Sequence, residues 1–270
     1  MESHGAASST RPFLAQGQRY LLGIYGGVGP LSHTVFEQHL LASSCRSGAR
    51  ADQDHPVWVL ASASSTPNRM DSIAGTGENA EAHIRHFAQL IERAGADVIF
   101  VVCNTAHAYH EPVQRDLGIP WVHLMEITAD EIRRTWPNVR RVGVLGTDGT
   151  LATGLYHRAL AARGLEPVAP PVGSPEQQQV MAAIFDPARG VKATGAQVSD
   201  WARASLAAAA DWTAEMGAEV VIAACTEVSA VLTPGAYRRI PVVDPLPVAA
   251  ELAVELAFGR RQPSEFLIRY

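Results

Sequence analysis

Short apolar runs alternate along the chain with longer segments in which apolar positions recur every three or four residues. The short runs are rich in Val and Ile and are typical of buried parallel strands, whereas the longer segments predict helices. Strands are expected near residues 20–25, 57–61, 97–102, 120–124, 141–146, 166–169, 219–223 and 241–243. Helices are expected near residues 31–46, 77–95, 107–117, 127–136, 150–163, 174–186, 194–217, 228–233 and 245–258. This alternation predicts an α/β fold with mainly parallel sheets flanked by helices.

Three blocks of sequence recur in the same order about 120 residues apart. The matching pairs are residues 22–31 with 142–151, 97–105 with 219–227, and 119–122 with 240–243. The period is too long for a solenoid and indicates a duplicated α/β unit. We therefore expect two Rossmann-like halves related by a pseudo-twofold axis, with the active site in the cleft between them. The predicted parts are a disordered leader over 1–18, a first domain of 19–124 plus 241–270, and a second domain of 125–240.

Composition excludes several classes of function. The formal charge is −5 and no basic run is present, which argues against nucleic acid or an anionic membrane as a partner. No apolar stretch reaches the roughly 18 residues of a membrane span. The cysteines are Cys45, Cys103 and Cys225, and this odd, sparse count favours a reducing cytoplasm over a disulfide framework. No paired-cysteine motif is present, so no metal site is expected.

Cys103 and Cys225 carry the chemical argument, because each directly follows a predicted strand at an equivalent point of the repeat. Ligands of open parallel sheets bind beyond the carboxyl ends of the strands. A thiol has a pKa of about 8.5 and can be tuned into an acid or a base. Two thiols that face one carbon from opposite sides would invert its configuration. The alternative is that both are small buried core residues. Cys45 lacks such a setting and is expected to be inert.

Three motifs together resemble the aspartate/glutamate racemase superfamily, in its aspartate racemase-like branch. They are residues 26–31 (GGVGPL), 103–107 (CNTAH) and 225–227 (CTE), and the resemblance extends over about residues 20–260. It implies an isomerase that needs no cofactor and uses a thiol and a thiolate as acid and base. The implied substrate is a small carboxylate, an acidic or related amino acid. The resemblance also implies a homodimer.

The resemblance also suggests residues that hold the substrate. Residues 66–69 resemble a family loop whose arginine binds a carboxylate, and Arg69 has the planar fork that this requires. Residues 184–186, followed by Lys192, resemble a segment that brings a lysine over the site; a solvated lysine is the alternative.

Further candidates directly follow predicted strands, where their hydroxyl, amide or N–H groups would hold a carboxylate whose charge grows during deprotonation. These candidates are Gly27, Asn104, Thr105, Thr147 and Thr226. His107 and Glu227 follow the two cysteines within the motifs. They are expected either to tune the thiols unequally or to cap helices.

Two positions depart from the family pattern. Ser32-His33 stands where Ala-Thr is usual, and Asn68 stands where Asp is frequent. His33 is predicted to contact the substrate or to act as an extra acid or base; a helix-start residue without chemical role is the alternative. The departures leave other reactions open, namely a maleate isomerase-like reaction, a rearrangement or cyclisation, and a non-catalytic binding protein. A dinucleotide loop at the glycines is not favoured, because its spacing does not fit.

Overall fold

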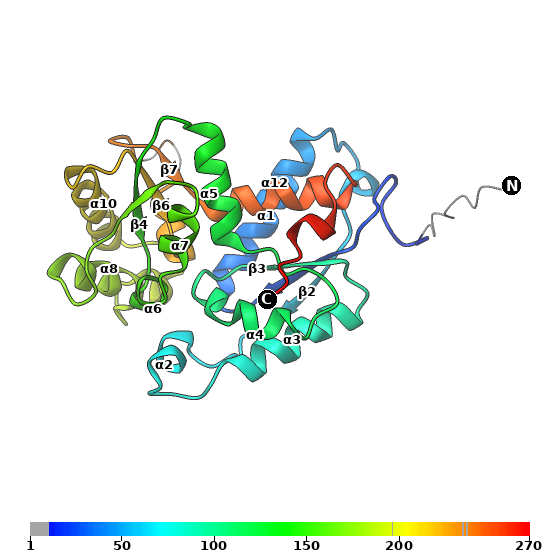
Figure 1. Ribbon diagram of the computed structural model, residues 1–270, viewed down its shortest axis with the longest axis horizontal. Coiled ribbons are helices and arrows are strands. Elements are labelled where there is room, and N and C mark those ends of the chain that lie inside the picture. The colour runs from blue at the N-terminus through cyan, green and yellow to red at the C-terminus, as the bar shows by residue number, and fades with distance from the viewer. Residues whose placement is uncertain (1–10, 196, 234, 236) are drawn as a thin grey trace, which may run out of the picture.

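The protein is described by a computed structural model over residues 11–195, 197–233, 235 and 237–270. Residues 1–10 of the predicted leader and residue 196 of the predicted helix 194–217 lie outside the described residues. The chain forms two parallel sheets, each flanked by helices (Figure 1), which confirms the predicted α/β class. The exact boundary between two domains stays a prediction.

The first sheet contains β1 (Leu22–Gly26), β2 (Trp58–Ser62) and β3 (Val98–Val101) in the order β2-β1-β3. All pairs are parallel. The strand predicted near 120–124 is reduced to a single parallel bridge between Ile99 and Trp121. Two features limit it to one bridge: Pro120 has no N–H to donate, and the next helix already begins at Leu124.

The second sheet contains β4 (Arg141–Leu145), β5 (Glu166–Val168), β6 (Val220–Ala223) and β7 (Val242–Val243) in the order β5-β4-β6-β7. These strands are also parallel. The order matches that of the first sheet, with β7 in the place of the Trp121 bridge. The sequence repeat therefore corresponds to a repeated topology.

Helices connect and cover the strands. They are α1 (Pro30–Arg46), η1 (Asp52–Asp54), α2 (Arg69–Ala74), α3 (Glu81–Arg93), η2 (Thr105–Tyr109), α4 (His110–Gln114), α5 (Leu124–Thr135), α6 (Asp148–Ala152), α7 (Leu155–Ala161), α8 (Pro175–Phe185), α9 (Val191–Thr194), α10 (Asp200–Glu215), α11 (Thr226–Ser229), α12 (Pro245–Ala257) and η3 (Pro263–Phe266). Within the described ranges, no helix is long and apolar enough to cross a bilayer.

The helices differ from the prediction at several points. The predicted helix 150–163 is divided at Gly154, whose φ of 63° is left-handed and ends a regular helix. The predicted helix 107–117 is a 3₁₀ segment followed by the short α4. Helix α10 starts late because Ser199 caps it, accepting a hydrogen bond from the Ala202 N–H. Helices α2, η1 and η3 were not predicted, since each is too short to show a period.

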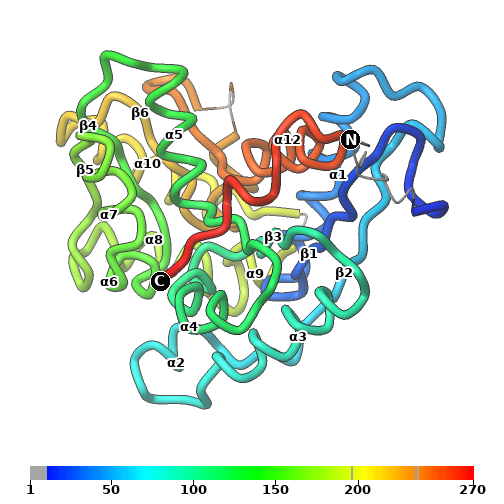
Figure 2. The backbone as a smooth tube through the Cα atoms, turned by 45° about the vertical axis from the view of Figure 1, so that its right-hand side comes forward, coloured from blue at the N-terminus to red at the C-terminus, as the bar shows by residue number. Residues whose placement is uncertain are grey.

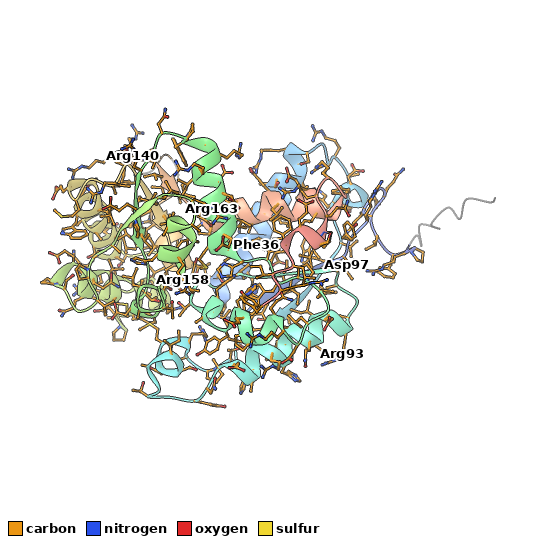
Figure 3. The ribbon with its side chains drawn as sticks, viewed as in Figure 1. Phe36, Arg93, Asp97, Arg140, Arg158 and Arg163 are labelled. Atoms are coloured by element: carbon orange, nitrogen blue, oxygen red, sulfur yellow. The ribbon has the colours of Figure 1, made fainter. Side chains whose placement is uncertain are left out.

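Two helices join the halves. Helix α12 packs against α1 and α5, and α5 packs in turn against α7 (Figures 1 and 2). Helix α12 is apolar almost all round, as expected of a helix buried on most sides. Arg163, which follows α7 and lies next to α5 in Figure 3, pairs with Glu126 and Asp130 at 2.6 Å each. One apolar cluster consequently runs from Leu22 in β1 to Ile222 in β6.

The described part of the predicted leader, residues 11–18, is attached to the first sheet, in contrast to the predicted disorder. Arg11 forms an ion pair with Asp97 at 2.8 Å. Asp97, labelled in Figure 3, immediately precedes β3. The side chain of Gln18 is buried and donates to the carbonyls of Tyr20 and Val57. These contacts fasten residues 11–18 to the first sheet. Their polar composition therefore reflects satisfied hydrogen bonds instead of disorder.

Three histidine rings pack together beyond the end of β3. The ring centroids of His107 and His123 are 5.2 Å apart, and those of His110 and His123 are 4.8 Å apart. The segment after α12 ends beside α4 (Figures 1 and 2), where the Tyr270 hydroxyl donates to Nδ1 of His110 at 2.8 Å. Burial lowers the pKa of His107 to about 3, of His110 to about 4 and of His123 to about 2. All three rings are therefore neutral in the folded protein near pH 7.

We expect the free energy of unfolding to fall as the pH drops below 6.5. The unfolded chain binds protons at these histidines near pH 6.5, whereas the folded chain keeps them neutral until about pH 4. Each ring contributes up to about 1.4 kcal/mol per pH unit over that interval. Urea denaturation at pH 7, 6 and 5 measures the slope.

His123→Phe should reduce that slope by the share of one proton. His86 is exposed, so His86→Gln should leave the slope unchanged. A wild-type stability that is flat between pH 7 and 5 would contradict the prediction.

Candidate active site

A cavity of about 290 Å³ opens between the two sheets, at the carboxyl ends of their strands. Its wall combines loops that follow β1, β2, β3, β4 and β6 with the region of α8 and α9. The lining residues are Val28, Thr66, Asn68, Arg69, Met70, Cys103, Asn104, Thr105, Thr147, Phe185, Lys192, Cys225, Thr226 and Glu227. Most of the residues that the sequence singled out are therefore brought together, although they lie far apart along the chain. Among the described residues, no group of acidic, histidine and cysteine side chains is arranged to hold a metal ion.

The two thiols come from equivalent positions of the two sheets. Cys103 follows β3 and Cys225 follows β6, and each residue is 8% exposed. Each of these strands is hydrogen-bonded to the first strand of its half, β1 or β4. The parallel topology thus delivers one thiol from each half to the same cavity.

Cys225 lies in a dense polar arrangement. Its Sγ donates to Oε2 of Glu227 at 2.9 Å. The Thr226 hydroxyl donates to the same oxygen at 3.2 Å, and Nζ of Lys192 donates to Oε1 at 2.5 Å. The Glu227 side chain is only 8% exposed and that of Lys192 is 33% exposed, so the carboxylate end of the pair is buried. Such a buried carboxylate requires a cation and several donors, and it has both.

These contacts fix the protonation states of the group. Burial raises the pKa of Cys225 well above its usual value, and the neighbouring Glu227 carboxylate raises it further. Cys225 is therefore a protonated thiol in the resting protein. Burial alone would favour the neutral forms of Lys192 and Glu227, but their mutual attraction and hydrogen bond outweigh it. The pKa of Lys192 is raised and that of Glu227 is lowered, so both remain charged.

Cys103 is held through its backbone. Nδ1 of His107 donates to the Cys103 carbonyl at 2.9 Å, while Nε2 accepts from the Trp121 indole at 3.1 Å and from the Leu124 N–H at 3.2 Å. The ring is almost fully buried and does not line the cavity. His107 was predicted either to tune a thiol or to cap a helix; in the structure it contacts the peptide of Cys103 and positions that residue.

Side-chain donors surround the space next to Cys103. The Tyr156 hydroxyl donates to Oδ1 of Asn104 at 2.7 Å, which leaves the Asn104 amide N–H groups as donors. The hydroxyls of Thr105, Thr147 and Thr150 form a buried triangle with edges of 2.9 to 3.1 Å. Thr105 follows β3 and Thr147 follows β4, so this triangle joins the two halves.

The Arg69 guanidinium has an unpaired N–H donor on the side that carries Nε. Its Nη1 donates to the carbonyls of Thr66 and Pro67 at 3.1 and 2.9 Å, whereas its buried Nε has no hydrogen-bond partner. The guanidinium is thus held by one corner and retains donors for a carboxylate. Asn68, which departs from the family pattern, caps α2 by accepting from the Met70 N–H at 2.9 Å. Helix α2 packs against α6 and so carries Arg69 to the second half.

Gly27 and His33 do not line the cavity, in contrast to the prediction that they bind substrate. The Gly27 N–H donates to Nδ1 of His33 at 3.1 Å. Gly27 has a φ of 81°, and a Cβ there would lie 2.5 Å from the Ala63 nitrogen. Only glycine fits this close approach of two loops. Gly27 and His33 therefore hold the loop that follows β1 in place and do not face the cavity.

Five lining residues were not among the predicted site residues: Val28, Thr66, Asn68, Met70 and Phe185. Val28, Thr66 and Phe185 belong to segments that the motifs had already marked, and Met70 immediately follows Arg69. The signal that could have identified these residues is therefore their closeness in sequence to the motifs. Their apolar or neutral side chains gave no chemical reason to choose them.

The fold and the site together define an α/β protein that has one thiol after the equivalent strand of each of its two sheets. The chain belongs to the Asp/Glu/Hydantoin racemase family, whose model matches residues 26–253. This membership confirms the predicted superfamily and the prediction of a racemase-type isomerase.

Sequence identity is below 30% to three relatives that the chain matches over most of its length. The chain is 29% identical to the broad specificity amino-acid racemase RacX of Bacillus subtilis, over 83% of this chain and 92% of that protein. Its structure is similar to Picrophilus torridus aspartate racemase, with a TM-score of 0.73, 24% identity and coverage of 92% and 97%. It is also similar to an aspartate racemase homologue from Pyrococcus horikoshii OT3, with a TM-score of 0.68, 24% identity and coverage of 88% and 99%. At these identities the structural likeness establishes the fold alone.

We expect alkylation of Cys225 to respond in opposite directions to its two charged neighbours. Glu227→Gln removes the carboxylate that disfavours the thiolate, so iodoacetamide should react faster at pH 7.5. Lys192→Met removes the cation, so the reaction should become slower. Each unit of pKa shift changes the thiolate fraction about tenfold. Peptide mass spectrometry gives the rate at each cysteine separately.

Cys45 is exposed and serves as an internal reference within every sample. Glu78→Gln provides a matched control, because this carboxylate is 71% exposed and outside the cavity lining. Equal rates at Cys225 in all four proteins would refute the electrostatic coupling.

Proposed function

We propose that this protein racemises an α-amino acid by passing the α-proton between the Cys103 and Cys225 thiols, with no cofactor. The observation that carries the proposal is the arrival of one thiol from each half at a single cavity. A two-base reaction needs an acid and a base on opposite faces of one carbon, and it needs no other reacting group. Both groups must stay reduced, which suits the cytoplasmic location expected from the sequence.

The unequal surroundings of the thiols assign their starting roles. Cys225 holds its proton, so it is the acid in the first half of the cycle, which leaves the role of base to Cys103. Cys103 takes the α-proton, and Cys225 returns a proton to the opposite face and becomes the thiolate. For the other enantiomer these roles are exchanged. The Lys192 ammonium, paired to Glu227 beside Cys225, compensates the charge that appears there.

The substrate carboxylate is proposed to lie against the side of the Arg69 guanidinium that carries Nε. Charge develops on this carboxylate when the α-proton leaves, because the carbanion is delocalised onto its oxygens. Donors placed in advance at such a charge lower the barrier without any rearrangement. The unpartnered Nε of Arg69 and the amide of Asn104 are the donors that support this assignment.

A second candidate is an isomerase in which one cysteine attacks the substrate as a nucleophile, as in a maleate isomerase-like reaction. The observation that favours it is the asymmetry of the pair, since only Cys225 has a carboxylate partner. Such a reaction passes through a covalent adduct on one sulfur. Intact-protein mass spectrometry during turnover would show a mass increase that a proton-transfer reaction lacks.

We expect Cys103→Ser and Cys225→Ser each to reduce racemisation by at least about a hundredfold, the usual contribution of a positioned acid or base. The measurement is loss of optical rotation together with incorporation of deuterium at Cα in deuterated water. Cys45→Ser should retain wild-type rates, because Cys45 is exposed and outside the cavity lining. Undiminished racemisation in either active-site variant would exclude the two-thiol mechanism.

A further inference from the structure

The charges of the cavity are few. Of the described residues that line it, only Arg69, Lys192 and Glu227 carry acidic or basic side chains. Aspartate or glutamate would bring two carboxylates, and each is held best by a cation of its own. The question is therefore which of the two cations is available.

Lys192 is already engaged. Its Nζ lies 2.5 Å from Oε1 of Glu227, whose side chain is 8% exposed. The second oxygen of Glu227 accepts hydrogen bonds from Cys225 and Thr226. A second substrate carboxylate at Lys192 would have to draw the ammonium away from Glu227. That would leave a buried carboxylate without its cation and would place another negative charge beside it.

Arg69 can satisfy one carboxylate. Its Nη1 is occupied by two backbone carbonyls, so only the side that carries the unpartnered Nε remains. That side matches a single carboxylate in a two-pronged contact. The remaining wall includes apolar side chains: Val28 is 3% exposed, and Met70 and Phe185 also line the cavity. Nζ of Lys192 lies 5.5 Å from the Phe185 ring, so the engaged cation adjoins this apolar part.

We propose that the substrate is an α-amino acid with one carboxylate and an uncharged, largely apolar side chain. The Lys192–Glu227 pair excludes a second carboxylate, and Val28, Met70 and Phe185 receive the side chain. This inference rests on the proposed racemase function and departs from the acidic substrate that the family resemblance implies. Lys192 is then a specificity-determining residue, because Glu227 compensates its charge and keeps it from a second substrate carboxylate.

The test compares L-methionine and L-leucine with L-aspartate and L-glutamate. For each amino acid, kcat/KM for exchange of the α-proton is measured by mass spectrometry in deuterated water. We expect the two neutral amino acids to exceed the two acidic ones by at least about tenfold, the ratio that 1.4 kcal/mol of discrimination produces. Preference for aspartate or glutamate would overturn the inference and leave the racemase function standing. Exchange from no amino acid would overturn both.

Glu227→Gln sharpens the test, because it releases Lys192 while keeping the shape of the side chain. Overall activity should fall, but the ratio of kcat/KM for aspartate to that for methionine should rise at least about tenfold over wild type. Adding Lys192→Met to this variant should cancel the rise. An unchanged ratio in Glu227→Gln would show that the ion pair does not set specificity.

Binding provides a readout that does not depend on turnover. The Cys103→Ser/Cys225→Ser variant keeps Arg69, Lys192 and Glu227, and calorimetric titration gives its Kd for each amino acid. Methionine should bind at least about ten times more tightly than aspartate. Tighter binding of aspartate would contradict the proposed substrate class even if no variant turned over.

Discussion

The packing of α12 and α5 between the two sheets is the constraint on which the site depends. Each sheet alone would present its strand ends to solvent. The apolar surface of α12 covers α1 on one side and meets α5, which is fastened to the second half through Arg163. A continuous core then holds β1 and β6 in one body. Because the cavity wall is shared by both halves, its shape is set by this packing as much as by the loops that line it.

Within that frame the two halves have the same topology but different chemistry. The strand orders are equivalent, and a cysteine follows the third strand of each half. On the first side a buried histidine holds the peptide of Cys103. On the second side the Glu227 carboxylate accepts a hydrogen bond from the Cys225 thiol and forms an ion pair with Lys192. The two halves thus share the positions of the cysteines and differ in the groups that contact them.

Much of the fold could be predicted from the sequence, because apolar runs and helical periods are local signals. The positions of Cys103 and Cys225 followed from the ends of those runs and from the repeat. Helix α2 was not predicted, since six residues show no period, and it delivers both Arg69 and Met70 to the cavity. The ion pair between Lys192 and Glu227 joins residues 35 positions apart and leaves no pattern along the chain. Gly27 and His33 belong to a motif, yet motif membership does not separate a residue that lines a cavity from one that supports the loop behind it.

The carboxylate beside only one of the two thiols has a kinetic consequence. Enantiomers have equal free energies in solution, so the equilibrium constant of a racemase is one whatever its active site. The Haldane relation then requires kcat/KM to be the same for both enantiomers. The raised pKa of the Cys225 thiol therefore cannot make one enantiomer accumulate over the other. It can only divide the same catalytic efficiency differently, giving one enantiomer a higher turnover number and a proportionally weaker apparent affinity.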